Sequence, residues 1–252
     1  MVPTERPRVS VYPNERGVAR ALAERLAEAI ARKPGMVLGL PTGRTPVLLY
    51  RELALLHQEG RIDFSRVTTF NLDEFLGVSP GDPGSYRTYM QQHLFRRVNL
   101  STGRVHFLNG ATKDPEAECA RYEHAIEEAG GIDLQILGIG TNGHIGFNEP
   151  ARELQSHTHR VALKPETRRS NAALFGGDPE KVPTEALSMG MTTILHARSI
   201  VLLATGKSKA PCIERVINGP ITTDLPASFL QLHANAELML DNAAAGKINQ
   251  QY

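Results

Sequence analysis

Short, largely apolar segments recur along this 252-residue chain, and each of the clearest ones ends in a polar turn that contains glycine. These segments are residues 36–40, 134–137 and 199–204, which read MVLGL, LQIL and SIVLLA. An apolar strand without polar alternation is buried on both faces, as parallel strands are in a sheet that helices cover on each side. The feature therefore predicts a parallel sheet between two layers of helices.

Helical patterns alternate with these segments along the whole chain. Residues 18–31, for example, follow the potential N-cap Asn14 and carry apolar side chains at helical spacing. The alternation predicts an α/β fold, a single doubly wound domain over residues 1–252 with a mostly parallel sheet and helices on both faces, which is a Rossmann-like arrangement. The predicted strands are 9–12, 36–40, 67–70, 134–137, 199–204 and 237–240, and the predicted helices are 18–31, 47–58, 85–95, 115–129 and 208–216.

Residues 165–183 are rich in charge and include a Gly-Gly-Asp-Pro run, so we expect this segment to be mobile. Composition does not decide whether it is a lid over a site or a surface loop.

The overall composition argues against several classes of partner. With 28 Lys and Arg against 27 Asp and Glu, the formal net charge of +1 gives no reason to expect nucleic acid or a membrane surface as the main partner. No apolar run approaches the roughly 20 residues that span a bilayer. The polar N-terminus does not look like a signal peptide, and Cys119 and Cys212 lack metal-ligand neighbours and look like reduced thiols. We therefore expect a soluble, cytoplasmic protein.

Polar turns follow four of the predicted strands. In an open α/β sheet, ligands bind beyond the carboxyl ends of the strands, so we expect these turns to converge on one site. The turns are residues 42–45, 71–74, 138–149 and 205–209.

Two of these turns have the character of anion sites. Thr42, Gly43, Arg44 and Thr45 lie between a strand and a helix, where backbone N–H groups face an anion and Gly43 permits close approach. Such turns also occur as plain connections. Residues 205–209 repeat the arrangement and add two lysines, whose charges are unfavourable at a helix start unless an anion is present. Together the two turns favour phosphate binding.

The turn after the third predicted strand carries the adjacent carboxylates Asp73 and Glu74. An Asp at such a position is often a cap or turn former. Next to a substrate, however, desolvation would raise its pKa above the usual value of about 3.9 and make it a general base. Both interpretations remain open from these residues alone.

The most informative stretch is residues 138–150, where glycines surround His144 and Glu149 follows closely. A histidine can titrate near neutral pH, and a nearby carboxylate can fix its tautomer. The glycine frame favours a catalytic histidine over a loop histidine bonded to the backbone. No dinucleotide-binding fingerprint is present, and no second His or Cys lies at metal-ligand spacing, so we expect no metal.

The same segments resemble the glucosamine-6-phosphate deaminase family, the glucosamine/galactosamine-6-phosphate isomerases. The resemblance runs in order from about residue 8 to 240, and GHIGFNEP at 143–150 is its most specific part. The other matching segments are LGLPTG at 38–43 with the following Thr45-Pro46, FNLDE at 70–74, Ser85-Tyr86, Val182-Pro183, Thr205-Gly206 with Lys209, and LQLH at 230–233.

The resemblance implies conversion of glucosamine 6-phosphate and water to fructose 6-phosphate and ammonia, with no metal or organic cofactor. It implies that Asp73 moves a proton between C2 and C1, that His144 assists ring opening, and that Glu149 and the residue at 142, here Asn142, orient His144. The partner would be a small sugar phosphate, and a homo-oligomer stays open. The implied substrate and phosphate contacts are Thr42, Gly43, Arg44, Thr45, Tyr86 and Lys209.

This chain departs from the family pattern at three positions. Asn142 stands where many members have Asp, Ala173 aligns with the lid arginine that contacts phosphate, and Arg44 replaces a glycine. We hypothesise that Arg44 supplies the missing guanidinium, because its planar fork suits phosphate oxygens; Arg168 or Arg169 are the alternatives. The rival functions are 6-phosphogluconolactonase or galactosamine-6-phosphate isomerase on the same fold, and a sugar-phosphate sensor without catalysis.

Overall fold

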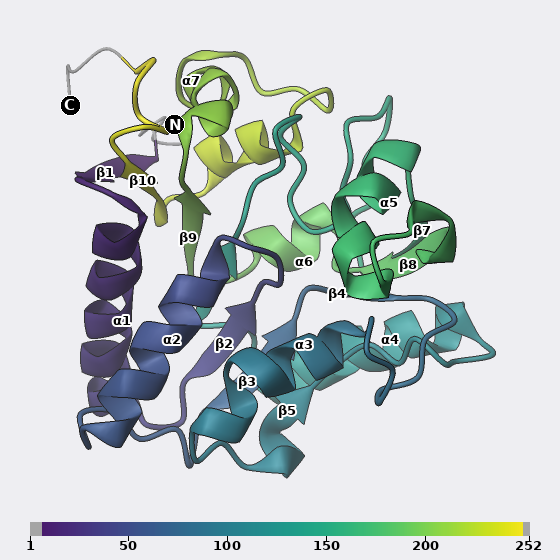
Figure 1. The fold of residues 1–252 in the computed structure, drawn as a ribbon, viewed down its shortest axis with the longest axis horizontal. Helices are drawn as coiled ribbons and strands as arrows, with labels where there is room; N and C mark the ends of the chain where they lie inside the picture. Colours follow the sequence, from purple (N-terminus) through teal and green to yellow (C-terminus); the bar gives the residue numbers. More distant parts are fainter. Residues whose placement is uncertain (1–6, 249–252) are drawn as a thin grey trace.

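The structure is a computed structural model that describes residues 7–248, so the ends of the predicted domain range 1–252 lie outside the described residues. Its main sheet has seven strands, and all neighbouring strands run parallel (Figure 1). In sheet order they are β1 (Arg8–Tyr12), β10 (Ala236–Asp241), β9 (Ser199–Ala204), β6 (Leu134–Leu137), β2 (Val37–Leu40), β3 (Thr68–Asn71) and β5 (Val105–His106).

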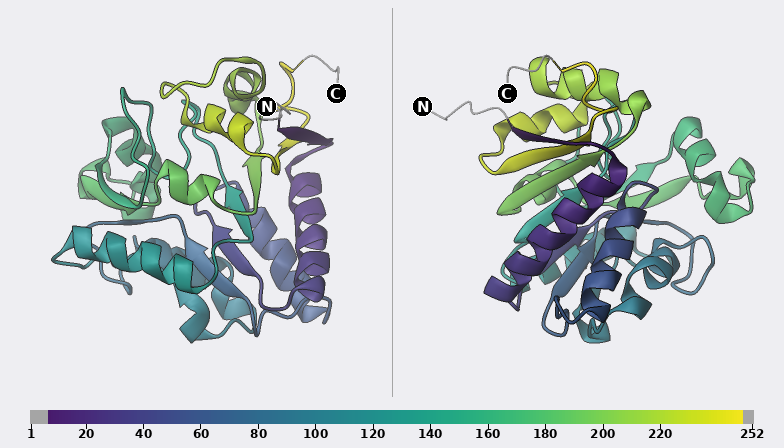
Figure 2. Two further views of the ribbon diagram at one scale, coloured as in Figure 1. Left: turned by 180° about the vertical axis from the view of Figure 1, so that it is seen from behind. Right: turned by 60° about the vertical axis from the view of Figure 1, so that its left-hand side comes forward.

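Helices cover both faces of this sheet, as Figures 1 and 2 show from opposite sides. Alternate residues of each central strand enter different cores. In β9, Val201 and Leu203 belong to the core that includes residues of α1 and α2, whereas Ile200 and Leu202 belong to the core that includes residues of α4 and α7. This two-sided burial confirms the predicted doubly wound α/β fold. The helices are α1 (Glu15–Arg32), α2 (Pro46–Gln58), α3 (Tyr86–His93), α4 (Pro115–Glu128), α5 (Pro165–Asn171), α6 (Met191–Leu195) and α7 (Ala210–Asn218).

Side-chain caps fix the start of three helices. Asn14 accepts a hydrogen bond from the Gly17 N–H at 3.0 Å, and Ser85 accepts one from the Thr88 N–H at 3.0 Å. Asp114 caps α4 in the same way. These bonds satisfy N–H groups that have no partner inside the helix, so the first turn forms where the sequence places the cap.

A second, antiparallel sheet was not predicted. It has three strands in the order β4 (Asp73–Phe75), β8 (Glu185–Ser188) and β7 (His159–Ala162). Its strands lack the continuous apolar character that marks the main sheet: β7 alternates half-buried and exposed residues, and β4 buries Asp73 and Glu74. Only long-range pairing with β8 makes these segments strands.

The predicted mobile segment 165–183 contains α5 and two short 3-10 helices, Ala172–Phe175 and Pro179–Lys181. In Figure 1 it lies beside β7 and β8, at one side of the main sheet. Phe175 anchors it, because its ring lies 5.2 Å from the Phe75 ring, centroid to centroid. A Cβ on Gly84 would come within 2.4 Å of the Phe175 ring, so glycine is needed for this close approach.

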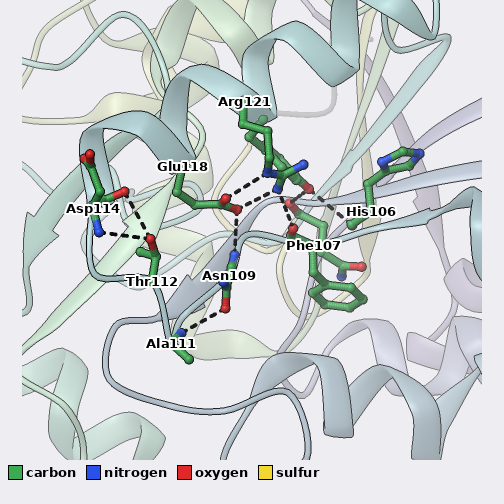
Figure 3. A network of polar contacts seen from close by, with 10 residues as sticks. His106, Phe107, Asn109, Ala111, Thr112, Asp114, Glu118 and Arg121 are labelled. Atoms are coloured by element: carbon green, nitrogen blue, oxygen red, sulfur yellow. Dashed lines mark hydrogen bonds and ion pairs between the residues drawn. The ribbon is translucent and has the colours of Figure 1, made fainter.

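The connection from β5 to α4 is held by a network around Glu118 (Figure 3). The Glu118 carboxylate accepts from the Asn109 N–H at 2.7 Å and from Arg121 at 2.6 and 2.7 Å, and Arg121 also donates to the Phe107 carbonyl. Gly110, in the same connection, accepts a hydrogen bond from the Gly77 N–H at 2.7 Å. The network therefore supports the chain just after β4, which carries Asp73.

Among residues 7–248, no helix combines the length and the apolar character needed to cross a membrane.

Candidate active site

The four predicted turns follow four adjacent strands. Strands β9, β6, β2 and β3 are neighbours in the sheet and run parallel, so their carboxyl ends lie along one edge. The chain leaves β2 through α2 towards β3, and it leaves β6 in the opposite direction towards β9, which makes the gap between β2 and β6 a topological switch point. Ligands bind at such a point in doubly wound sheets, and the expected convergence of the turns along one edge is confirmed.

The turn after β2 is shaped from behind by two buried tyrosines. Tyr50 donates a hydrogen bond to the Pro41 carbonyl, and Tyr89 donates one to the Gly43 carbonyl. Gly43 has a φ of +100°, which side chains rarely adopt. Thr45 precedes α2 without making a side-chain cap bond. The start of α2 and the Thr45 hydroxyl are thus available to an anion.

Two cations accompany this turn. Lys209 donates to the Ile139 carbonyl at 2.6 Å, and burial lowers its pKa, with a further lowering by the Arg44 guanidinium. Within residues 7–248, Arg44 itself has neither a hydrogen bond nor an ion pair. Two positive groups that disfavour each other near an open helix start form a place where a dianion would be stabilised.

The adjacent carboxylates on β4 have different surroundings. Glu74 accepts hydrogen bonds from the N–H groups of Phe75, Tyr86 and Arg87 and so caps α3. Asp73 is buried at 7% exposure, and its Oδ1 has no hydrogen-bond partner in the part of the chain that the structure describes. Burial raises the pKa of Asp73 to about 8, with a smaller contribution from the Glu74 charge. Asp73 is therefore the carboxylate prepared for proton transfer, and Glu74 is structural.

His144 is held by a chain of polar contacts within the loop after β6. Its Nδ1 lies 2.8 Å from Asn142 Oδ1, and Asn142 Nδ2 donates to Glu149 Oε2 at 3.2 Å. Glycine makes the loop possible at two points: a Cβ on Gly140 would come within 2.3 Å of the His144 ring, and Gly143 has a φ of +88°. The predicted trio Asn142, His144 and Glu149 is brought together.

Burial lowers the pKa of His144, which keeps the imidazole neutral at pH 7. The Glu149 carboxylate acts in the opposite direction, and the Lys209 and Lys164 ammonium groups add to the lowering. Because Asn142 is uncharged, it stabilises no imidazolium as an aspartate would. A neutral imidazole can accept a proton, so the site offers a base at neutral pH.

Contacts that involve α5 close the site from the other side. Thr167 donates a hydrogen bond to Glu149 Oε1, and Tyr86 donates one to Asn171 Oδ1 at 3.0 Å. The buried Tyr86 hydroxyl also interacts with Thr42 in the anion turn. A path of contacts thus leads from His144 through Asn142, Glu149 and α5 to Tyr86 and the turn after β2.

Three residues of this path were missed in the sequence: Lys164, Thr167 and Asn171. Lys164 lies 3.9 Å from Glu149 Oε2 and donates to the Pro150 carbonyl at 2.7 Å. The only sequence signal for them was their place in or next to the segment 165–183. By contrast, the two arginines of that segment face elsewhere: Arg168 contacts Val182, Pro179 and Glu180, and Arg169 pairs with Glu166.

In the described range 7–248, no three His, Cys, Asp or Glu side chains are arranged to hold a metal ion.

Comparison with known proteins adds independent information. Residues 14–239 match the family described as glucosamine-6-phosphate isomerases/6-phosphogluconolactonase. The chain is 50% identical to glucosamine-6-phosphate deaminase 2 of Bacillus subtilis over 224 residues, covering 88% of this chain and 90% of the relative. It is 48% identical to the glucosamine-6-phosphate deaminase of Halothermothrix orenii over 238 residues, 94% of this chain and 98% of the relative.

Solved structures agree with these relationships. A monomeric glucosamine-6-phosphate deaminase superposes with a TM-score of 0.92 at 42% identity, covering 96% of this chain and 100% of the other. A 6-phosphogluconolactonase from Trypanosoma cruzi superposes with a TM-score of 0.76 at 22% identity, over 96% of this chain and 97% of the other, which is a likeness of fold. The chain belongs to the glucosamine-6-phosphate isomerase/6-phosphogluconolactonase family, as its motifs indicated.

Proposed function

We propose that this protein is a glucosamine-6-phosphate deaminase, which converts glucosamine 6-phosphate and water to fructose 6-phosphate and ammonia. The observation that carries the proposal is the pairing, on one edge of the sheet, of a partnerless buried carboxyl at Asp73 with a neutral, oriented His144. The activity of the relatives at 48% and 50% identity supports the same conclusion.

The phosphate of the substrate binds at the start of α2. Backbone N–H groups from Gly43 to Thr45 and the Thr42 and Thr45 hydroxyls donate to its oxygens, and Arg44 and Lys209 neutralise its charge. Arg44 takes the part of the lid arginine that is absent at Ala173, since Arg168 and Arg169 are engaged within their own segment. Tyr86 lies between this turn and α5 and contacts the sugar.

His144 opens the sugar ring. In its neutral form it accepts the proton of the O1 hydroxyl and delivers it to the ring oxygen as the C1–O5 bond breaks, which leaves the open-chain aldehyde. Asn142 and Glu149 hold the imidazole for this transfer.

Asp73 then carries out the isomerisation. The substrate ammonium beside Asp73 favours the carboxylate, which offsets the raised pKa on binding. The carboxylate removes the C2 proton to form an enolamine and returns a proton to C1. The product is an iminium at C2; water adds to it, and ammonia leaves with the electron pair of the C–N bond. Each step is a proton transfer or the addition of water.

The proposal is tested by measuring ammonia release from glucosamine, galactosamine and mannosamine 6-phosphates, with the Asp73→Asn variant as control. We expect ammonia from glucosamine 6-phosphate at the highest kcat/KM and almost none from the variant. A preference for galactosamine 6-phosphate would replace the proposed substrate. Hydrolysis of 6-phosphogluconolactone without any ammonia release would reject the proposed reaction.

We also propose that the protein is a cytoplasmic monomer. Cys119 and Cys212 are both free and buried, as is usual in a reducing compartment. A homo-oligomer was left open by the sequence, but the solved relative is described as monomeric. Stable oligomer interfaces are large and apolar, whereas the large exposed apolar side chains of the described residues are only Val11, Leu55, Ile221 and Leu232. Light scattering should give the mass of one chain.

A further inference from the structure

Thr167, on α5, contacts the polar chain that ends at His144. It is buried at 5% exposure, and its hydroxyl donates to Glu149 Oε1, while the other carboxylate oxygen accepts from Asn142 Nδ2 at 3.2 Å. Glu149 is itself buried at 8% exposure, so its oxygens depend on protein donors. Neither the motifs nor the relatives' names assign a role to this threonine.

The carboxylate decides which way the Asn142 amide points. Glu149 Oε2 only accepts hydrogen bonds when ionised, so the amide presents Nδ2 to it and Oδ1 to His144. Oδ1 also accepts from the His144 backbone N–H at 3.2 Å. A flipped amide would set its oxygen against the carboxylate and its NH2 group against an N–H donor, which is unfavourable on both sides.

The amide in turn decides the tautomer of His144. Asn142 Oδ1 cannot donate, so Nδ1, 2.8 Å away, carries the proton, and the lone pair is on Nε2. This is the tautomer that accepts a proton at Nε2. An aspartate at 142 could also hold an imidazolium, but the neutral amide works only through its orientation, which makes this chain depend on whatever fixes that orientation.

We propose that Thr167 is a positioning residue that fixes the tautomer of His144 through Glu149 and Asn142, so that a base at Nε2 is present when α5 is docked against Glu149. Without the hydroxyl, Glu149 lacks a donor at Oε1 and takes up a proton or turns towards Lys164, which lies 3.9 Å from Oε2. A protonated Glu149 donates to Asn142, the amide flips, and the ring proton moves to Nε2. The inference rests on the proposed function for its consequence in catalysis but not for the tautomer itself.

The direct test is the 15N spectrum of His144 in the full chain, read without substrate, with the signal assigned by loss in His144→Gln. We expect Nε2 to show the unprotonated shift and Nδ1 the protonated one in the unaltered protein. In Thr167→Val, which keeps the shape of the side chain, we expect the Nε2-protonated tautomer to appear. Thr167→Ser restores the hydroxyl and should restore the original spectrum.

The charged groups that act on His144 are Glu149, Lys209 and Lys164, and none is altered in these variants. Ser170→Ala is the matched control, because Ser170 is on the same helix and donates to the Thr167 carbonyl at 2.9 Å without contacting Glu149. It should leave the tautomer unchanged. If Thr167→Val does not fold, Thr167→Ala provides the same comparison.

Turnover gives a second reading. Thr167→Val should lower kcat about tenfold with KM within about twofold, because a positioned acid–base group contributes about 10²- to 10⁴-fold and only its orientation is lost. Thr167→Ser should stay within about twofold of the unaltered protein. An unchanged tautomer in Thr167→Val, whatever happens to turnover, would overturn the inference. A changed tautomer in a protein that releases no ammonia would leave the inference standing and reject the proposed function.

Discussion

The two sides of the active site prepare their proton carriers in opposite ways. Asp73 is on β4, within a buried sheet, and one of its oxygens has no partner among residues 7–248. His144 is on a loop and is guided through Asn142 and Glu149 to α5. Removal of partners raises the pKa of Asp73, whereas burial lowers the pKa of His144 and hydrogen bonds choose its tautomer.

The contrast teaches that rigidity comes from different sources on the two sides. Strand pairing fixes Asp73 opposite Ser188 of β8, and Glu74 next to it caps α3, so the backbone position depends on packing alone. The histidine side depends on a series of side-chain bonds that each residue can break. Changes at Asp73 should therefore abolish chemistry, and changes along the histidine chain should tune it.

The largest effect is expected from Asp73→Asn, which removes the base from the strand side. We expect kcat to fall about 10³-fold, within the range of about 10²- to 10⁴-fold that general acid–base catalysis contributes. Substrate binding, measured by calorimetry, should remain. Glu74→Gln on the same strand is the control; it should weaken the capping of α3 and lower Tm, yet keep kcat within about tenfold. Equal losses of kcat in the two variants would remove the distinction between these carboxylates.

Arg44→Gly tests a group that serves both sides equally. We expect KM for glucosamine 6-phosphate to rise about tenfold with kcat nearly unchanged, because a charge-assisted contact to phosphate contributes about 1.5–3 kcal/mol in ground state and transition state alike. Steady-state kinetics measure the split. Arg169→Gly is the matched control, since Arg169 pairs with Glu166 on the surface. If KM stays the same in Arg44→Gly and rises in Arg169→Gly, the phosphate is held from α5 instead.

Asn142→Asp sharpens the contrast on the histidine side. A carboxylate at 2.8 Å from Nδ1 favours the imidazolium, so the pKa of His144 should rise by about one unit. An NMR titration of the His144 ring follows it directly, and the protonated form should persist to higher pH than in the unaltered protein. A pKa that falls or does not move would show that Glu149, not residue 142, controls the charge on the ring.

The smallest effect concerns stability and follows from the raised pKa of Asp73. Between about pH 4, where this group ionises in the unfolded chain, and about pH 8, the folded state retains a proton that the unfolded state has lost. The contribution of Asp73 to the free energy of unfolding therefore declines as pH rises through this window. Asp73→Asn should unfold at a Tm higher by about 3 °C or more at pH 8, with a smaller difference at pH 5. Parallel melting curves across this range would contradict the raised pKa.

The repeating pattern of apolar strands and helices was enough to predict the main sheet, because two-sided burial requires side chains that are apolar on both faces. The site residues Asp73, Asn142, His144 and Glu149 could be named for a similar reason: polar turns that follow buried strands must gather at one edge of a parallel sheet. Their geometry was not accessible in this way. The sequence did not reveal β7, β4 or the antiparallel pairing with β8, since these short strands carry no continuous apolar signal.

The order of residues by itself determined the fold class, the edge of the sheet where chemistry occurs and the types of side chain present there, because burial periodicity and turn chemistry are local. Only the tertiary structure decided which of two adjacent carboxylates caps a helix, which keeps an oxygen without a partner, and that Thr167 lies on Glu149. These outcomes depend on contacts between residues far apart in the chain. Such contacts set desolvation and hydrogen bonding, and through them the pKa and the tautomer of each group.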